Sequence, residues 1–262
     1  MNDIFSIKRF SASFRRLITE KGIKMFGSIL ILLFLTVLFM NVQFDVSFYM
    51  NIREFFVIMG LMFGPILYTA VVANEFTSQS KGISYLLMPS SSFEKWLLNN
   101  IVVIALYYIV YGGLFRLIEL WMIGRLKAEY LLSDEMLQPL AFNSGIFIVS
   151  ILIGVIVSLG ILLGSHYFKK NSLIFSLFIL FGLTVFVFFA DFAIANYVFD
   201  GLIEFGNTAP FSSVYVIDPS TAAGEYLLMV PLSIKELSMS IFLPIILLLS
   251  VTNFVRIREK QL

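Results

Sequence analysis

Long apolar runs separated by short polar segments dominate the chain. Six of these runs come close to the roughly 20 residues that a helix needs to cross a bilayer. They are 25–43, 55–74, 97–115, 145–165, 172–190 and 237–255. The last run is the weakest, because Pro244 interrupts it and two charged residues precede it. The pattern predicts an all-α integral membrane protein with six transmembrane helices, forming one transmembrane domain over residues 1–262.

Composition agrees with this class and excludes several kinds of chemistry. Of the 262 residues, 59% are apolar and 13% are charged, whereas soluble domains carry about 25% charged residues. The chain has no cysteine and one histidine, His166, so thiolate chemistry and multi-histidine metal sites are excluded. It has no GxxxxGK[ST] loop for ATP. We expect no cofactor, no metal site, no catalytic site and no nucleic-acid partner.

The distribution of lysine and arginine predicts the orientation. With the N-terminus in the cytoplasm, the inner segments are 1–24, 75–96, 166–171 and 256–262, and they hold 13 of the 18 basic residues. The positive-inside rule favours this orientation. We therefore expect both termini in the cytoplasm and a location in a bacterial inner membrane.

Residues 1–24 form a basic leader with a helical period. Its apolar residues Ile7, Phe10, Phe14, Leu17 and Ile18 share one helix face, and Lys8, Arg9, Arg15 and Arg16 lie opposite. This spacing predicts an amphipathic helix lying on an anionic inner leaflet. The alternative is an ordinary basic flank that sets topology.

The cytoplasmic loop 75–96 carries signals of local structure. Ser91 and Glu94 have the spacing of a capping box, which predicts a helix that begins there and continues through Trp96 into the third span. Pro89 ends any preceding helix. Upstream, Ile83, Leu86 and Leu87 form an apolar patch, which either lies on the membrane surface or binds a cytoplasmic partner.

The order of residues in this loop resembles the E…G…LL..P.S signature of ABC-2-type permeases, the membrane subunits of ATP-binding-cassette exporters. The matching residues are Glu75, Gly82, Leu86, Leu87, Pro89 and Ser91. The resemblance implies that the loop is a coupling helix that docks on a separate ATPase, with Ile83 and Glu94 contributing. Two positions depart from the pattern: Ile83 stands where the family commonly has threonine, and Ser92-Phe93 replaces the arginine often found after the serine.

The same resemblance places a translocation path along the second and fifth spans. The candidate residues are Phe56, Met59, Phe63, Phe178 and Phe181. An aromatic path suits an amphipathic or lipidic cargo, whereas the alternative is lipid-facing phenylalanine. The resemblance also implies short re-entrant helices in the outer segment 191–236, which is rich in acidic residues.

Three further groups of residues carry structural expectations. Tyr107, Tyr108 and Tyr111 lie mid-span, and buried hydroxyls are expected to hydrogen-bond across helices. Arg116 and Glu119 lie one turn apart and are expected to pair. Small residues in the fourth span, around Gly154, predict close helix packing.

Together these patterns predict the permease subunit of an exporter, acting as a homodimer or heterodimer in the lipid bilayer with two ATPase subunits. A non-transporting membrane scaffold and an ion-coupled carrier are the alternatives. A carrier predicts inverted repeats and charges in mid-membrane, and the sequence shows neither.

Overall fold

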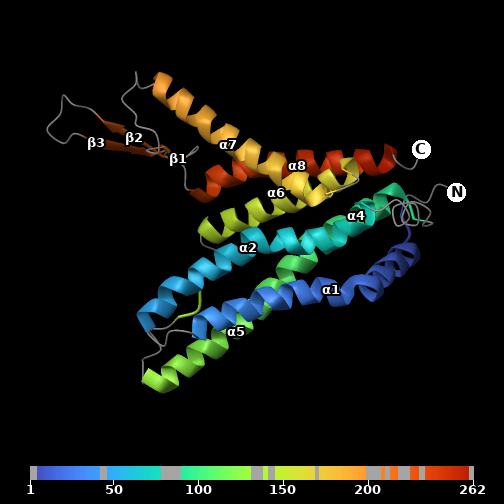
Figure 1. The fold of residues 1–262 in the computed structure, drawn as a ribbon, viewed down its shortest axis with the longest axis horizontal. Coiled ribbons are helices and arrows are strands. Elements are labelled where there is room, and N and C mark those ends of the chain that lie inside the picture. Colours follow the sequence, from blue (N-terminus) through green and yellow to red (C-terminus); the bar gives the residue numbers. More distant parts are fainter. Residues whose placement is uncertain are drawn as a thin grey trace.

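The structure is a computed structural model of the chain. It describes residues 5–41, 46–77, 90–130, 138–140, 145–168, 171–198, 208–209, 213–217, 225–229 and 234–259. Long helices lie side by side in an elongated bundle, and a small sheet projects from one end (Figure 1).

The helices account for most of the described residues. They are α1 (Ile7–Asn41), α2 (Val46–Thr77), α4 (Ser92–Asn100), the π-helix η1 (Ile101–Leu106), α5 (Tyr107–Tyr130), α6 (Gly145–Tyr167), α7 (Ser172–Val198) and α8 (Ile234–Glu259). Because α4, η1 and α5 follow one another without a break, residues 92–130 form one continuous helical segment. The prediction of a helix that starts at Ser91 and runs into the third span is confirmed.

Five helical segments in the described part of the chain are long and apolar enough to cross a membrane. They are Ile7–Met40, Ile52–Ala73, Ser92–Glu129, Phe147–Tyr167 and Met239–Glu259. The remaining predicted span falls in α7, which has 27 residues and is apolar over its described part Ser172–Phe186. The chain thus has the helical architecture of a multi-pass membrane protein, and a sixth crossing stays a prediction.

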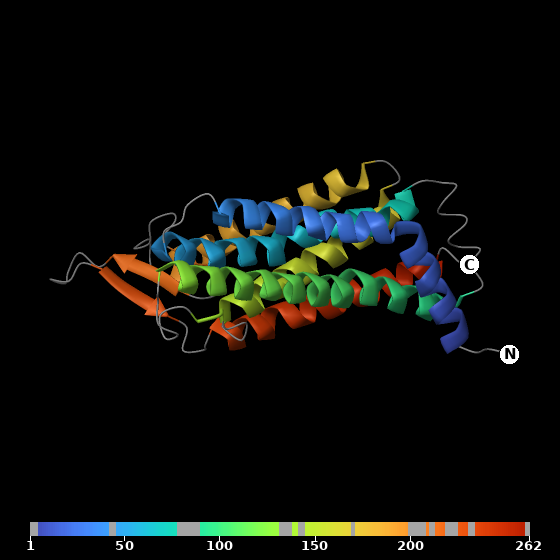
Figure 2. The same ribbon diagram turned by 90° about the horizontal axis from the view of Figure 1, so that it is seen from below.

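The basic leader is not a separate helix. It is the N-terminal part of α1, which continues into the first span without a break, and Figure 2 shows that this part bends across the end of the bundle. Leu17 is buried, and Phe10, Phe14 and Ile18 pack against the protein core, whereas Ile7 is exposed. Most of the predicted apolar face therefore covers the protein itself.

The outer segment 191–236 differs from the prediction. Its described residues form the end of α7, the start of α8 and three antiparallel strands, β1 (Thr208–Ala209), β2 (Ser213–Ile217) and β3 (Glu225–Met229), in the order β1-β2-β3. The expected re-entrant helices are wrong for these residues. The physical reason lies in the sequence of β2, where Val, Tyr, Val and Ile follow one another, and β-branched and aromatic residues favour strands.

Helix α6 lies at the centre of the bundle and packs against α2, α7 and α8. A Cβ added at Gly154 would overlap the carbonyl oxygen of Leu61 and the hydroxyl of Tyr108. The absence of a side chain at Gly154 thus lets the α6 backbone approach α2 closely, as expected for small residues at helix interfaces. This face serves packing within one chain.

Candidate functional site

The predicted docking residues fall partly outside the described part of the chain. Ser91 and Glu94 lie at the start of α4, and the backbone of Glu75 lies in the last turn of α2. The residues outside the described ranges are Gly82, Ile83, Leu86, Leu87 and Pro89. The structure therefore shows the points where the loop leaves α2 and enters α4.

The capping box at the start of α4 is present as predicted. The Ser91 hydroxyl accepts from the Glu94 amide at 3.1 Å, and the Glu94 carboxylate accepts from the Ser91 amide at 2.9 Å. Two amides that the helix leaves without intrahelical partners are thereby satisfied. The box sets where the loop ends and the helix begins.

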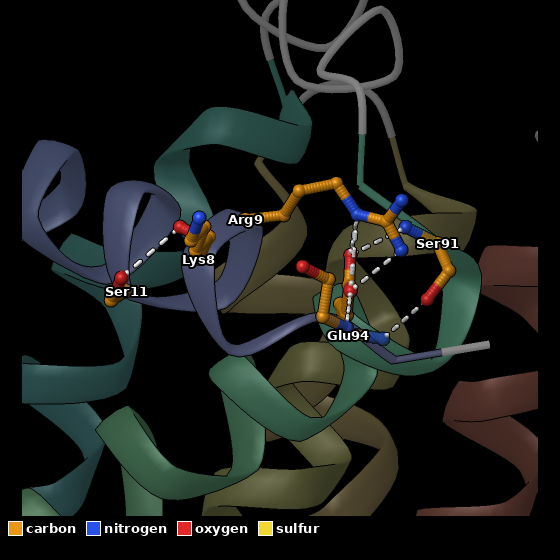
Figure 3. A network of polar contacts seen from close by, with 6 residues as sticks. Lys8, Arg9, Ser11, Ser91 and Glu94 are labelled. Carbon is orange, nitrogen blue, oxygen red and sulfur yellow. Dashed lines mark hydrogen bonds and ion pairs between the residues drawn. The ribbon is translucent and has the colours of Figure 1, made fainter. Parts of the chain in front are cut away.

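The same carboxylate also binds the leader (Figure 3). The Arg9 guanidinium donates to Glu94 from Nη2 at 3.0 Å and from Nε at 3.3 Å to each oxygen. The Ser6 amide donates to Glu94 Oε1 at 2.6 Å. We call Ser6, Arg9, Ser91 and Glu94 the Glu94 cluster.

The Glu94 cluster places one negative charge at the start of two helices. Ser6 directly precedes α1, and Glu94 lies in the first turn of α4. Helix N-termini carry partial positive charge and unpaired amides, so an anion stabilises both. The Glu94 side chain is only 1% exposed, and buried charges persist where they are paired and hydrogen-bonded. The cluster is therefore a fixed joint between the leader and α4.

The helical period of the leader puts Arg9 on its polar face and does not predict the contact with Glu94. The two residues are 85 positions apart, and no local spacing relates them. The one hint in the sequence that Glu94 has a basic partner was its charge. Glu94 is one of few acidic residues in the inner segments, which are mainly basic.

Aromatic side chains extend this joint to α8. Ring centroids of Phe5 and Phe93 lie 6.3 Å apart, those of Phe93 and Trp96 5.5 Å, and those of Trp96 and Phe254 5.8 Å. The Trp96 indole donates to the Ser250 carbonyl at 2.9 Å. Trp96 thus contacts α8, and the start of α4 is packed between α1 and α8.

Further along the same helical segment, three tyrosines hydrogen-bond across helices, as predicted. Tyr107 donates to the Gly60 carbonyl at 2.7 Å, and Tyr111 donates to the Phe56 carbonyl at 3.4 Å. A Cβ added at Gly60 would overlap the Tyr111 hydroxyl. The π-helix η1 directly precedes Tyr107, and π-helical turns are common at functional positions in helices.

Tyr108 lies beside an interruption in α2. Pro65 is inside α2, and proline has no amide to donate to the carbonyl four residues earlier, which is that of Leu61. The Tyr108 hydroxyl lies 3.3 Å from the Leu61 carbonyl and 3.2 Å from the Ile151 carbonyl of α6. A side chain from α5 therefore replaces the hydrogen bond that Pro65 removes.

The predicted path residues lie on helices that α6 separates. Helix α6 packs against both α2 and α7, and Figure 1 shows it between them. Phe56 is half-buried and stacks on Phe39 at 5.4 Å, and Met59 is also half-buried. Exposed fractions are 52% for Phe63, 73% for Phe178 and 68% for Phe181. Their exposed faces are open to lipid or to a second chain, and the path assignment stays a prediction.

A second charged cluster lies at the opposite end of the bundle. Arg116 pairs with Glu119 at 2.6 Å, as predicted, and Arg53 of α2 lies 3.7 Å from the same carboxylate. Glu119 accepts from the Leu140 amide at 2.7 Å, and Arg53 donates to the Gln138 carbonyl at 2.7 Å. These contacts fix residues 138–140 against α2 and α5.

Comparisons with known proteins give no assignment: no family model matches the chain, and neither a curated protein nor a solved structure matches it.

Proposed function

We propose that the chain is the membrane-spanning permease subunit of an exporter of the ABC-2 type, driven by a separate ATPase that docks on loop 75–96. It acts as a dimer with an identical or related permease. The aromatic residues on α2 and α7 suit an amphipathic or lipidic cargo.

The arrangement of helix ends supports this proposal. Helix α1 begins, α2 ends, α4 begins and α8 ends at the same end of the bundle (Figure 1). An even number of crossings brings both ends of a chain to one side of a membrane, and α7 is the proposed sixth crossing. The excess of lysine and arginine in the segments at that end favours the cytoplasmic side.

The Glu94 cluster is the observation that carries the proposal. A loop that transmits force must be joined to helices that move with it, because a flexible connection would absorb the movement. Here the loop enters α4, whose first turn is fixed to the leader by a buried carboxylate and to α8 through Trp96. Displacement of the loop would therefore move α1, α4 and α8 together, and α4 continues through η1 into α5.

Co-purification tests the proposal. In a mild-detergent preparation from the native host, we expect the chain to bring a cassette ATPase with it. The double variant Leu86→Asp, Leu87→Asp should lose this ATPase, because buried carboxylates without partners oppose docking, while membrane insertion is unchanged. Ile7→Asp is the matched control, since Ile7 is an exposed apolar residue at the same end of the bundle.

Two results would contradict the assignment. Retention of the ATPase by the double variant removes the docking role of the loop. Absence of any ATPase from the wild-type preparation favours a non-transporting scaffold instead.

A further inference from the structure

The helical segment 92–130 is fixed near both of its ends by a buried carboxylate. Near its start, Glu94 pairs with Arg9 at 3.0 Å, and the Glu94 side chain is 1% exposed. Further along, the Glu119 side chain is 0% exposed and accepts from the Leu140 amide at 2.7 Å. The two glutamates are 25 positions apart, which at 1.5 Å per residue corresponds to about 37 Å of helix. This length is comparable with the thickness of a bilayer.

The π-helix η1 (Ile101–Leu106) lies between these two fixed points. A π-helix closes its hydrogen bonds over five residues, whereas an α-helix closes them over four. The segment therefore holds one residue more than a continuous α-helix needs between the same two points. Val102 and Val103 are 0% exposed, and Ala105 is exposed. The π-helical turn thus packs against the bundle with one face and is not a frayed helix end.

The helices on the two sides of η1 are held by different neighbours. On the side of α4, the Trp96 indole donates to the Ser250 carbonyl of α8. On the side of α5, Tyr107 donates to the Gly60 carbonyl of α2 at 2.7 Å, and the Tyr111 hydroxyl fills the space that a Cβ at Gly60 would occupy. Helix α1 contacts both α4 and α5. The π-helical turn is therefore the junction between a part fixed to α8 and a part fixed to α2.

We propose that η1 is a hinge that lets α4 move relative to α5. π-Helical turns are rare in proteins, and sharp changes of helix direction often occur at them. The hydrogen bonds of η1 open and re-form while those of α4 and α5 stay intact, so α4 tilts or shifts by up to about 1.5 Å, the rise of one residue. Hinges of this kind are a few residues that absorb a backbone change between rigid parts.

This inference rests on the proposed function in one respect: the docked ATPase supplies the force that moves α4 with the leader and α8. The Glu119 end of the segment stays in place, because η1 takes up the difference. The hinge itself is a property of this chain, so it is measurable without the ATPase.

Hydrogen–deuterium exchange of the full chain in mild detergent tests the hinge. After correction for intrinsic rates, peptides that cover η1 should exchange about five-fold faster than peptides that cover 110–118, a factor that corresponds to one hydrogen bond. Burial alone predicts the opposite of a difference, since Val102 and Val103 are as buried as Tyr111 and Phe115. Fast exchange in η1 therefore reports opening of its hydrogen bonds.

Two single-residue deletions separate the hinge from a static irregularity. Deletion of Ala105 removes the extra residue, so the segment becomes a continuous α-helix with both glutamates in place. Its exchange over the former η1 should slow to the level of 110–118, and its thermal midpoint should be at least that of the wild type. Deletion of Gly113 is the matched control, because a Cβ there would meet open space. It turns part of α5 by about 100°, displaces Tyr111 or Glu119, and should lower the midpoint.

Three results would overturn the proposal. They are equal exchange of η1 and 110–118 in the wild type, fast exchange that persists after deletion of Ala105, and an equal loss of thermal midpoint in the two deletion variants. Failure of the proposed function is seen separately, as the absence of an ATPase from the wild-type preparation.

Discussion

Replacing Glu94 with glutamine tests whether the leader is fixed to α4 by charge. Glutamine has nearly the same shape, but it offers one acceptor oxygen and one amide group that itself donates. In the native cluster both Glu94 oxygens accept: Oε1 from Ser6 and Arg9, and Oε2 from Ser91 and Arg9. In the variant, the glutamine NH2 group would face N–H donors of Ser6, Ser91 or Arg9 that the carboxylate oxygen had accepted from. The substitution also removes the negative charge that attracts Arg9.

The structure sets the expected size of the effect. Breaking a buried ion pair costs about 3–5 kcal/mol, and a hydrogen bond to a charged group contributes about 1.5–3 kcal/mol. The Arg9 side chain is 37% exposed, so solvent screens the electrostatic contribution of the pair that it forms with Glu94. We expect a loss of about 2 kcal/mol in the free energy that holds the leader on α4. This corresponds to about a 30-fold rise in the fraction of molecules in which the leader is detached from α4.

Hydrogen–deuterium exchange in mild detergent measures that population. Amides in the first turns of α1 should exchange about 30-fold faster in Glu94→Gln, whereas amides of α6 should be unchanged. The matched control is Glu20→Gln, which removes the exposed pair between Arg16 and Glu20, with side chains 45% and 50% exposed. Exposed pairs contribute about 0–1 kcal/mol, so exchange should change less than five-fold.

Equal exchange in the two variants would refute the reasoning, since the buried pair would then be worth no more than an exposed one. A double-mutant cycle with Arg9→Gln locates the effect. If the cluster acts through this pair, the double variant should exchange at nearly the rate of Glu94→Gln.

Two further predictions concern the helix contacts inside the bundle. Gly60→Ala should lower the thermal midpoint, with a cost of about 1–3 kcal/mol, because the added Cβ overlaps a tyrosine hydroxyl; Gly113→Ala, which meets open space, should leave it unchanged or raise it. Tyr108→Phe should cost about 1 kcal/mol, and less in a Pro65→Ala background, where α2 regains its own donor. Additive effects of Tyr108→Phe and Pro65→Ala in thermal unfolding would contradict the hydrogen-bond replacement.

Features that depend on neighbours along the chain were predictable. The capping box joins Ser91 to Glu94, and the ion pair joins Arg116 to Glu119; in each case the two residues are three positions apart, so helical geometry alone brings their groups together. The apolar runs likewise predict the membrane-crossing helices, because the bilayer fixes how long such a helix must be. Mid-span tyrosines predict hydrogen bonds, since a buried hydroxyl needs a partner.

The partners themselves were decided by the tertiary structure. The sequence does not show that Glu94 meets Arg9, that Trp96 reaches α8, or that Tyr108 lies beside the carbonyl left by Pro65. These contacts depend on how each helix is rotated and how far it is shifted along its neighbours. Most of these helices are apolar on all sides. Their sequence pattern therefore does not determine how each helix is rotated about its axis or shifted along its neighbours. The leader is the same case: its amphipathic period was correct, but only packing decided that most of its apolar face covers the protein core.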